Sequence, residues 1–347
     1  MIYEIEDLDL MYDIKFRRGV FRFFKNYESC HGISKCMARG LGDNCKGKII
    51  KAHSISKENG LDKIATVDKG GGKCVGKFIK GNETTINPFN QEYKAIYVPT
   101  KIASTFTGMC SKHDNDLFKT IDEFRELVID DQTVFEYTLR NAIYNSFDRM
   151  SNSECMLLRI QKYLQLFPDT DCPYIKIYNH IHHDEQILDK EVKKLYRLRD
   201  DTLNKLYYKS YKIEGNINIA GNFYTEENSI VYFITIIPGL NESNIIVSCV
   251  RDNNFIEMNE FFNFLNSLTL EYLQIFITYR LLSSTGIRHY YFNYDKWNSL
   301  DEDFKNECFD WIYFEDIHRT FDFNTSLLEA NIPNFIAQMT DKPISKS

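Results

Sequence analysis

Residues 108–118 read Gly-Met-Cys-Ser-Lys-His-Asp-Asn-Asp-Leu-Phe and place Cys110 three residues before His113. Two soft ligands at this spacing can bind one zinc ion from a single turn. A tetrahedral site needs two more ligands, and Cys36 and Cys45, which bracket a loop that contains glycine, can supply them. The stretch therefore predicts a zinc-braced region in the N-terminal part of the chain. The alternative is that these cysteines are ordinary buried thiols.

A second stretch, residues 49–55, reads Ile-Ile-Lys-Ala-His-Ser-Ile. Its alternation of apolar and polar residues predicts a strand that ends at His53. A histidine that closes a strand, followed downstream by a Cys-x-x-His-Asp turn that opens a helix, resembles the HNH nucleases of the ββα-metal type. The resemblance covers residues 28–122 and is closest to the subset with Ala-His-x-Ile in place of Asp-His-x-Ile and with zinc-binding cysteines around the core. It implies that two strands and a helix clasp a catalytic divalent cation, Mg²⁺ or Mn²⁺.

The resemblance also implies roles for individual residues. His53 falls on the general base, and Cys110 with His113 falls on the second pair of structural zinc ligands. Asp114 falls on the helix position that holds the catalytic cation, with Asp116 and His113 as further candidate ligands.

Two positions depart from the family's pattern. Members of the family often carry a metal ligand on the first strand at the position that Ala52 occupies here. Because alanine cannot bind a metal, water or substrate oxygens would complete the coordination of the cation. The family's central Asn is replaced by Thr105, with Ser104 beside it, and a hydroxyl there could brace the loop as the amide does.

These residue types suit phosphodiester hydrolysis. An imidazole with a pKa of about 6.5 can deprotonate water near neutral pH, and a carboxylate is a suitable ligand for a hard cation that neutralises the phosphate. The chain has a formal charge of −7, yet residues 46–80 carry nine lysines against three acidic residues, a local charge of +6. The lysines that flank His53 are predicted to hold the phosphate backbone without reading bases: Lys46, Lys48, Lys51 and Lys57. A solvated lysine-rich loop is the alternative.

The apolar periodicity predicts an α+β protein with a helical middle region. Helical spacing covers three segments, 118–150, 154–166 and 184–211, with a break near residues 130–131 and a stop at Pro168. Strand patterns then alternate with helices: strands at 216–220, 229–237 and 244–250, a helix over 258–282, a strand at 288–294 and a helix ending near Asp310. We therefore expect four parts: an arm over 1–27, a zinc-containing HNH-like domain over 28–125, a helical region over 126–213 and an α+β regulatory or recognition domain over 214–347.

The composition argues against a membrane or exported protein. The longest apolar run, 272–282, is shorter than the roughly 20 residues of a membrane helix, and the acidic N-terminus is unlike a signal peptide. Nine cysteines, an odd number, suit a reducing compartment, and Cys30 is a reserve zinc ligand. We expect a cytoplasmic protein.

Two further motifs are weaker. Residues 71–78 read Gly-Gly-Lys-Cys-Val-Gly-Lys-Phe, but Phe78 replaces the Ser/Thr that a phosphate-binding loop uses to hold magnesium. His182, His183 and Asp184 could bind a metal, although capping of a helix by Asp184 explains the cluster more simply.

The sequence thus favours a metal-dependent HNH-type endonuclease that acts on nucleic acid, preferably DNA. By resemblance, such nucleases often act in bacterial restriction or anti-phage defence with partners that license cleavage. One alternative is a non-catalytic, zinc-stabilised nucleic-acid-binding module. Another alternative is a sensor that binds a small ligand or a regulatory protein with its acidic, aromatic-rich C-terminal part. In that case the N-terminal region would form the contact between copies in a homo-oligomer.

Overall fold

The computed structural model describes residues 33–39, 41, 45, 47–80, 93–123, 128–166, 168, 172, 174–199, 206–227, 229–251, 255–282, 289–318 and 332–341. The predicted arm over 1–27, Cys30 and Lys46 lie outside the described residues. The fold is mixed α+β, as the sequence predicts.

The largest sheet has eight strands within the described residues, and all its pairings are antiparallel. Its order is β2 (Thr66–Val67), β3 (Lys73–Lys80), β11 (Tyr290–Phe292), β8 (Ile219–Glu227), β9 (Ile230–Ile237), β10 (Glu242–Val250) and β6 (Leu206–Glu214), with β4 (Tyr93–Pro99) also paired to β3. Strands from residues 66–99 therefore join strands from residues 206–292 in one sheet, across the domain boundary predicted near residue 125.

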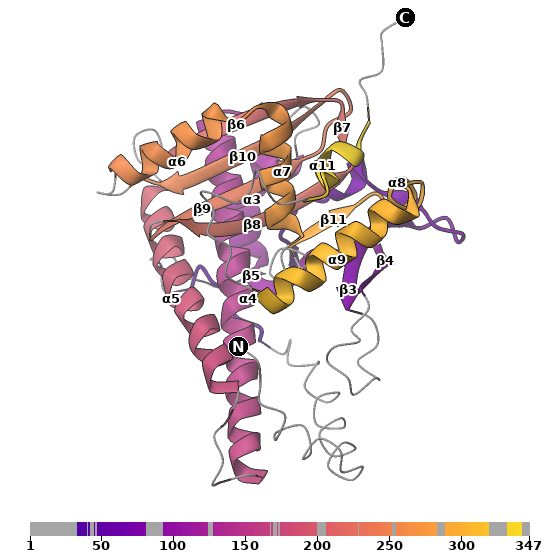
Figure 1. Cartoon of the computed structure of the whole chain (residues 1–347). Helices are drawn as coiled ribbons and strands as arrows, with labels where there is room; N and C mark the ends of the chain where they lie inside the picture. Colours follow the sequence, from indigo (N-terminus) through magenta and orange to yellow (C-terminus); the bar gives the residue numbers. More distant parts are fainter. Residues whose placement is uncertain are drawn as a thin grey trace, which may run out of the picture.

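Helices cover both faces of this sheet (Figure 1). One face packs against α6 (Phe255–Ser267), α7 (Leu270–Leu281), α8 (Tyr294–Asn298), α9 (Glu302–His318) and α11 (Phe335–Gln338). The other face packs against α3 (Ser111–Glu123), α4 (Asp131–Leu166) and α5 (Tyr174–Leu198). Strand β9 is buried at every position because successive side chains enter opposite cores.

A separate two-stranded ribbon carries the predicted site. Strand β1 (Ile49–His53) pairs antiparallel with β5 (Thr105–Cys110), and α3 follows β5 directly. Phe106 and Met109 of this ribbon enter the same core as α3 and α4, which anchors it to the body of the protein. A second short ribbon joins β7 (Asn216–Ile217) to β12 (Thr340–Asp341).

Several predicted boundaries are confirmed and others are wrong. The strand that ends at His53, the helix break near residues 130–131 and the stop before Pro168 agree with the structure. The helix predicted over 184–211 is wrong at both ends: α5 begins at Tyr174, so Asp184 lies inside it and does not cap it, and residues 206–214 form β6. The segment 154–166 continues α4, and the helix predicted over 258–282 is two helices.

Helices α4 and α5 run side by side and extend beyond the sheet (Figure 1). No helix in the described ranges has the combination of length and apolar character that crossing a bilayer requires.

Candidate metal centre and catalytic site

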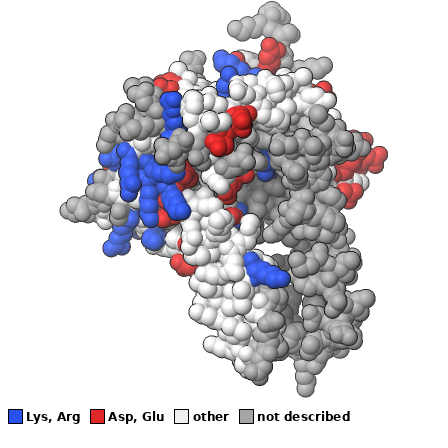
Figure 2. Space-filling model, turned by 60° about the vertical axis from the view of Figure 1, so that its left-hand side comes forward, with Lys and Arg blue, Asp and Glu red and all other residues white. Residues whose placement is uncertain are grey.

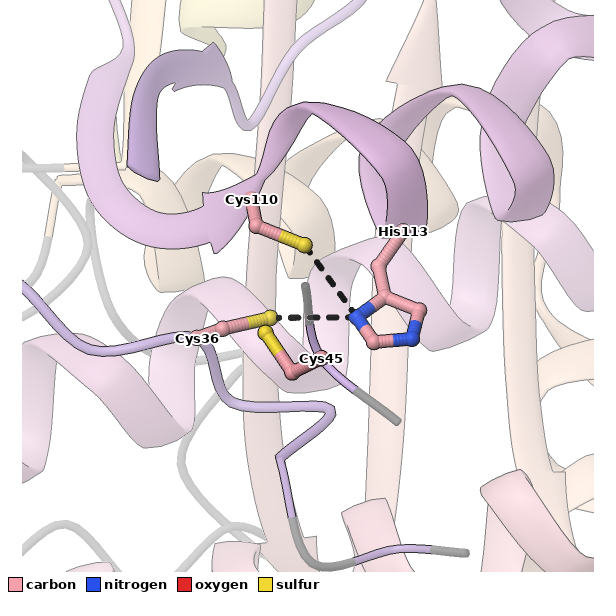
Figure 3. A group of neighbouring side chains, drawn as sticks. All are labelled: Cys36, Cys45, Cys110 and His113. Atoms are coloured by element: carbon pink, nitrogen blue, oxygen red, sulfur yellow. Dashed lines mark hydrogen bonds between the residues drawn. The ribbon is translucent and has the colours of Figure 1, made fainter. Parts of the chain in front are cut away.

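Three separate segments bring the four predicted zinc ligands together (Figure 3). Cys36 lies in a segment held beside β5, where the Met37 amide donates to the Gly108 carbonyl at 2.8 Å. Cys110 ends β5, His113 lies in the first turn of α3, and Cys45 lies just before β1. Their ligand atoms all lie within 4.8 Å of one another.

The donor set fits a metal such as zinc. The Nδ1 atom of His113 lies 3.3 Å from the sulfur of Cys36 and 3.3 Å from the sulfur of Cys110 (Figure 3). Cys36, Cys110 and His113 are buried, with at most 2% of their surface exposed. Three sulfurs and one imidazole nitrogen that converge from separate segments could hold a metal ion such as zinc.

The two buried thiols differ in acidity. Burial raises the pKa of Cys36 to about 12. Burial also acts to raise the pKa of Cys110, but the backbone N–H groups of His113 and Lys112 and the thiols of Cys45 and Cys36 outweigh it, so this pKa is lowered. Cys110 therefore forms a thiolate more readily than Cys36, and a thiolate is the form that binds a metal.

Gly47 lets the chain pass close to this cluster. A Cβ atom at this position would lie 2.9 Å from the Cys110 sulfur and 3.0 Å from the Lys112 nitrogen. The close approach explains why a glycine stands between Cys45 and the start of β1.

His53, at the end of β1, is held in one tautomer. Its Nδ1 lies 2.9 Å from the carbonyl oxygen of Ala103 and 3.3 Å from the hydroxyl of Ser104. Because a carbonyl only accepts hydrogen bonds, Nδ1 must carry the proton, and Nε2 is left with the lone pair. Burial lowers the pKa of the half-buried His53 and outweighs the hydrogen bond to Ala103, which raises it; the Arg140 charge lowers this pKa further and the Asp122 charge raises it. The net shift is downward, so the neutral form is favoured.

Ser104 braces the loop that follows His53. It adopts a φ of 56°, which is uncommon for a residue other than glycine. Its carbonyl accepts from the Ser54 amide at 2.9 Å, and its amide donates to the Tyr291 hydroxyl at 2.7 Å. Thr105 pairs with His53 across the ribbon and donates its hydroxyl to the Ile102 carbonyl at 2.9 Å.

The three α3 residues predicted as cation ligands lie in different surroundings. Asp114 is half-buried; burial raises its pKa, Asp122 raises it further, and Arg140 opposes this. His113 directs Nδ1 into the cysteine cluster. Asp116 is exposed and, at two residues from Asp114, lies roughly 200° around the helix axis from it. The face of α3 that carries Asp114 therefore does not carry Asp116.

Asp122 and Arg140 belong to this site although the sequence reasoning missed them. The two terminal nitrogens of the Arg140 guanidinium, Nη1 and Nη2, donate to the Asp122 carboxylate, Nη1 at 2.7 Å, and the Arg140 side chain is only 2% exposed. The guanidinium also lies 4.4 Å from the centre of the Phe118 ring. Two signals were present. Asp114, Phe118 and Asp122 share one helix face by their spacing, and Arg140 interrupts the apolar pattern of the segment 134–143.

The predicted phosphate-binding lysines are solvent-facing where they are described. Lys48, Lys51 and Lys57 are exposed. On the face drawn in Figure 2, Lys and Arg side chains gather at one side, whereas Asp and Glu are scattered.

The weaker motifs form no second site among the described residues. Residues 73–80 of the glycine-rich motif form strand β3, so no loop leads into a helix there. Asp184 accepts from the Tyr224 hydroxyl at 2.9 Å, and His182 pairs with Glu185 at 3.0 Å. The cysteine and histidine cluster is the only group of three or more metal-ligating side chains found in the described ranges.

Comparison of this chain with family models, with curated proteins and with solved structures gives no match.

Proposed function

We propose that this chain is a metal-dependent endonuclease of the HNH type that hydrolyses phosphodiester bonds of nucleic acid, preferably DNA. The observation that carries the proposal is the arrangement of β1, β5 and α3 around His53. The histidine closes the first strand, the second strand pairs with it antiparallel, and the helix follows the second strand without a loop.

His53 is the proposed general base. The Ala103 carbonyl holds the Nδ1 proton, so Nε2 is available to accept the proton of an attacking water. The water oxygen bonds to phosphorus, the phosphorus–oxygen bond of the leaving nucleotide breaks, and the leaving oxygen takes up a proton from solvent. Because burial lowers the pKa of His53, the imidazole is ready for this role near neutral pH.

Asp114 is the proposed ligand for the catalytic cation. The raised pKa of Asp114 shows that its half-buried carboxylate is costly to leave charged without a partner. A bound cation in place of the proton would stabilise the charged form. Oxygen ligands suit Mg²⁺ and Mn²⁺, whereas the nearby sulfur-rich cluster suits zinc. When bound, the divalent cation supplies charge neutralisation at the phosphate and at the departing oxygen.

Plasmid cleavage with Mg²⁺ or Mn²⁺ tests the proposal. We expect the wild type to cleave, and we expect Asp114→Ala to require more metal, with activity partly returning at high Mn²⁺. Asp116→Ala is the matched control on the same helix and should behave as the wild type. A wild type that cleaves neither DNA nor RNA with either metal would contradict the proposal.

One observation favours a second candidate, a non-catalytic nucleic-acid-binding module. Ala52 is 2% exposed and packs in the core beside the ribbon, so the first strand offers no cation ligand at the position before His53. In that case the chain would bind nucleic acid without cleaving it, which the same assay combined with a binding measurement distinguishes.

A further inference from the structure

We propose that Lys77, Lys94 and Lys101, here called the lysine ridge, bind the phosphate backbone of the DNA that His53 acts on. This inference rests on the proposed function, because it assigns a surface to the same substrate. It extends the basic site to β4 and to the turn that follows it, away from the lysines that flank His53 in sequence.

The register of β3 and β4 puts Lys77 and Lys94 on one face of the sheet. Lys77 is opposite Ile96, and Ile79 is opposite Lys94, so the two lysines are diagonal neighbours. Diagonal neighbours in an antiparallel pair are about 7–8 Å apart. Val75 and Val98 share this face and pack with Ile55, Ala103 and Tyr291, so the face is continuous with the loop after His53.

Three contacts connect the ridge to the catalytic histidine. The Lys77 ammonium lies 5.3 Å from the centre of the Tyr291 ring. The Tyr291 hydroxyl accepts from the Ser104 amide at 2.7 Å, and the Ser104 hydroxyl lies 3.3 Å from Nδ1 of His53. Lys101 lies two residues before Ala103, whose carbonyl holds the same imidazole.

The charges of the ridge are available to a polyanion. Lys94 and Lys101 are exposed and Lys77 is half-buried. Within the described ranges, the structure records no ion pair for these three lysines, whereas Lys73 nearby pairs with Asp62 at 3.4 Å. The Tyr291 ring attracts the Lys77 ammonium through its π face and holds the charge in place without neutralising it. Unpaired cations beside a proposed phosphodiesterase site complement a phosphate backbone.

The test is the salt dependence of binding to a short labelled duplex DNA, measured in full-length protein carrying His53→Ala so that cleavage does not interfere. The ridge variant adds Lys77→Gln, Lys94→Gln and Lys101→Gln. The matched control adds Lys162→Gln, Lys176→Gln and Lys190→Gln, which remove the same charge from exposed positions on α4 and α5. A double variant, Lys94→Gln with Lys101→Gln, changes only exposed side chains. It therefore tests the ridge without the risk that a change at the half-buried Lys77 disturbs the fold.

Each lost phosphate contact lowers the steepness of the plot of log binding constant against log salt concentration by about 0.9. We therefore expect the slope to become less steep by about 3 in the ridge variant and by about 2 in the double variant. It should stay unchanged in the control. Equal slopes for the ridge variant and its parent, or equal losses in ridge and control, would overturn the proposal. So would binding that depends on the ridge for single-stranded RNA but is absent for duplex DNA. If the wild type binds DNA through the ridge but does not cleave it, the proposed nuclease activity is refuted, and the proposed DNA binding by the ridge is retained.

Discussion

At His53, hydrogen bonding and burial shift the pKa of the same imidazole in opposite directions, and burial has the larger effect. The Ala103 carbonyl fixes which nitrogen carries the proton, and burial lowers the pKa of the ring. Together they present a neutral imidazole with its free lone pair on Nε2. A general base is effective when it is unprotonated at the working pH.

The pH profile of kcat/KM tests this description. Because the folded-state pKa of His53 lies below its ordinary value of about 6.5, the acidic limb of the profile should lie below pH 6.5. The same shift means that the unfolded chain takes up a proton more readily than the folded one. The contribution of His53 to folding stability is therefore complete above about pH 6.5 and decreases as the pH falls below it. An acidic limb centred above pH 7 would contradict the assignment of the base.

Sequence reasoning at the residue scale found the groups whose chemistry shows in their spacing. Cys110 and His113 were found because one turn of chain carries both, and His53 because it closes an alternating segment. The pair of Asp122 and Arg140 was missed because its partners lie on different helices, and only the packing of α3 on α4 brings them together.

Helix α3 is held at both ends. The cysteine and histidine cluster holds its first turn. Near its other end, the Ile121 carbonyl accepts from Ser56 and Asn59, and the Ile121 amide donates to Glu136. Asp114 lies between these two anchors, so the position of the proposed cation ligand depends on both.

Removal of one cluster ligand tests the first anchor. The wild type should contain about one zinc per chain that survives dialysis, because a closed tetrahedral site contributes directly to folding. Cys110→Ser should lose that zinc and lower the thermal stability. Cys249→Ser, at a buried cysteine outside the cluster, is the control and should retain the zinc. A well-folded wild type without zinc would refute the structural site.

Substitution of Asp122 tests a further contact at this end of α3, the ion pair between Asp122 and Arg140 of α4. Asp122→Asn leaves the buried Arg140 without its opposite charge, and we expect a loss of about 3 kcal/mol in the free energy of unfolding, at the low end of the range for buried pairs because the Asp122 side chain is 38% exposed. Asp116→Asn on the exposed face should change it by less than about 0.5 kcal/mol. Denaturant unfolding measures both, and equal effects would show that the pair does not anchor the helix.

The sequence predicted helices and strands correctly where either the helical or the alternating spacing of apolar residues dominates a segment. Residues 206–211 read Leu-Tyr-Tyr-Lys-Ser-Tyr and continue a helix-like composition. In the structure they begin β6, which pairs along the whole length of β10. Tyr207 packs on α6, whereas the Tyr208 hydroxyl donates to Asp131 at the start of α4. This strand was missed because its stability comes from partners distant in the sequence. The break before α7 did leave a local signal, since Thr269 caps that helix.

For the whole molecule, the main difference from the sequence-based expectation is that one sheet joins strands from residues 66–99 to strands from residues 206–292. Strand β3 pairs with β11, with Gly76 opposite Phe292, and Phe78 packs against Trp297 and Phe335. No local periodicity reveals such a pairing, because it depends on contacts between residues more than 200 positions apart.

A fragment of residues 28–125 therefore should not fold by itself. Without β11 and β8, the core of Val75, Ala103 and Tyr291 beside the His53 loop is incomplete. We expect the fragment to lack dispersed amide signals in an NMR spectrum even with zinc, whereas the full chain should show them. A folded, zinc-binding fragment would support the predicted domain boundary instead.

The most direct test of the account compares His53→Ala with the wild type in DNA cleavage and DNA binding, at the same metal concentration. We expect cleavage to fall by at least about 10²-fold, the usual contribution of a general base, while zinc content and DNA affinity stay near those of the wild type. Cleavage by His53→Ala at the wild-type rate would show that this histidine does not activate the water.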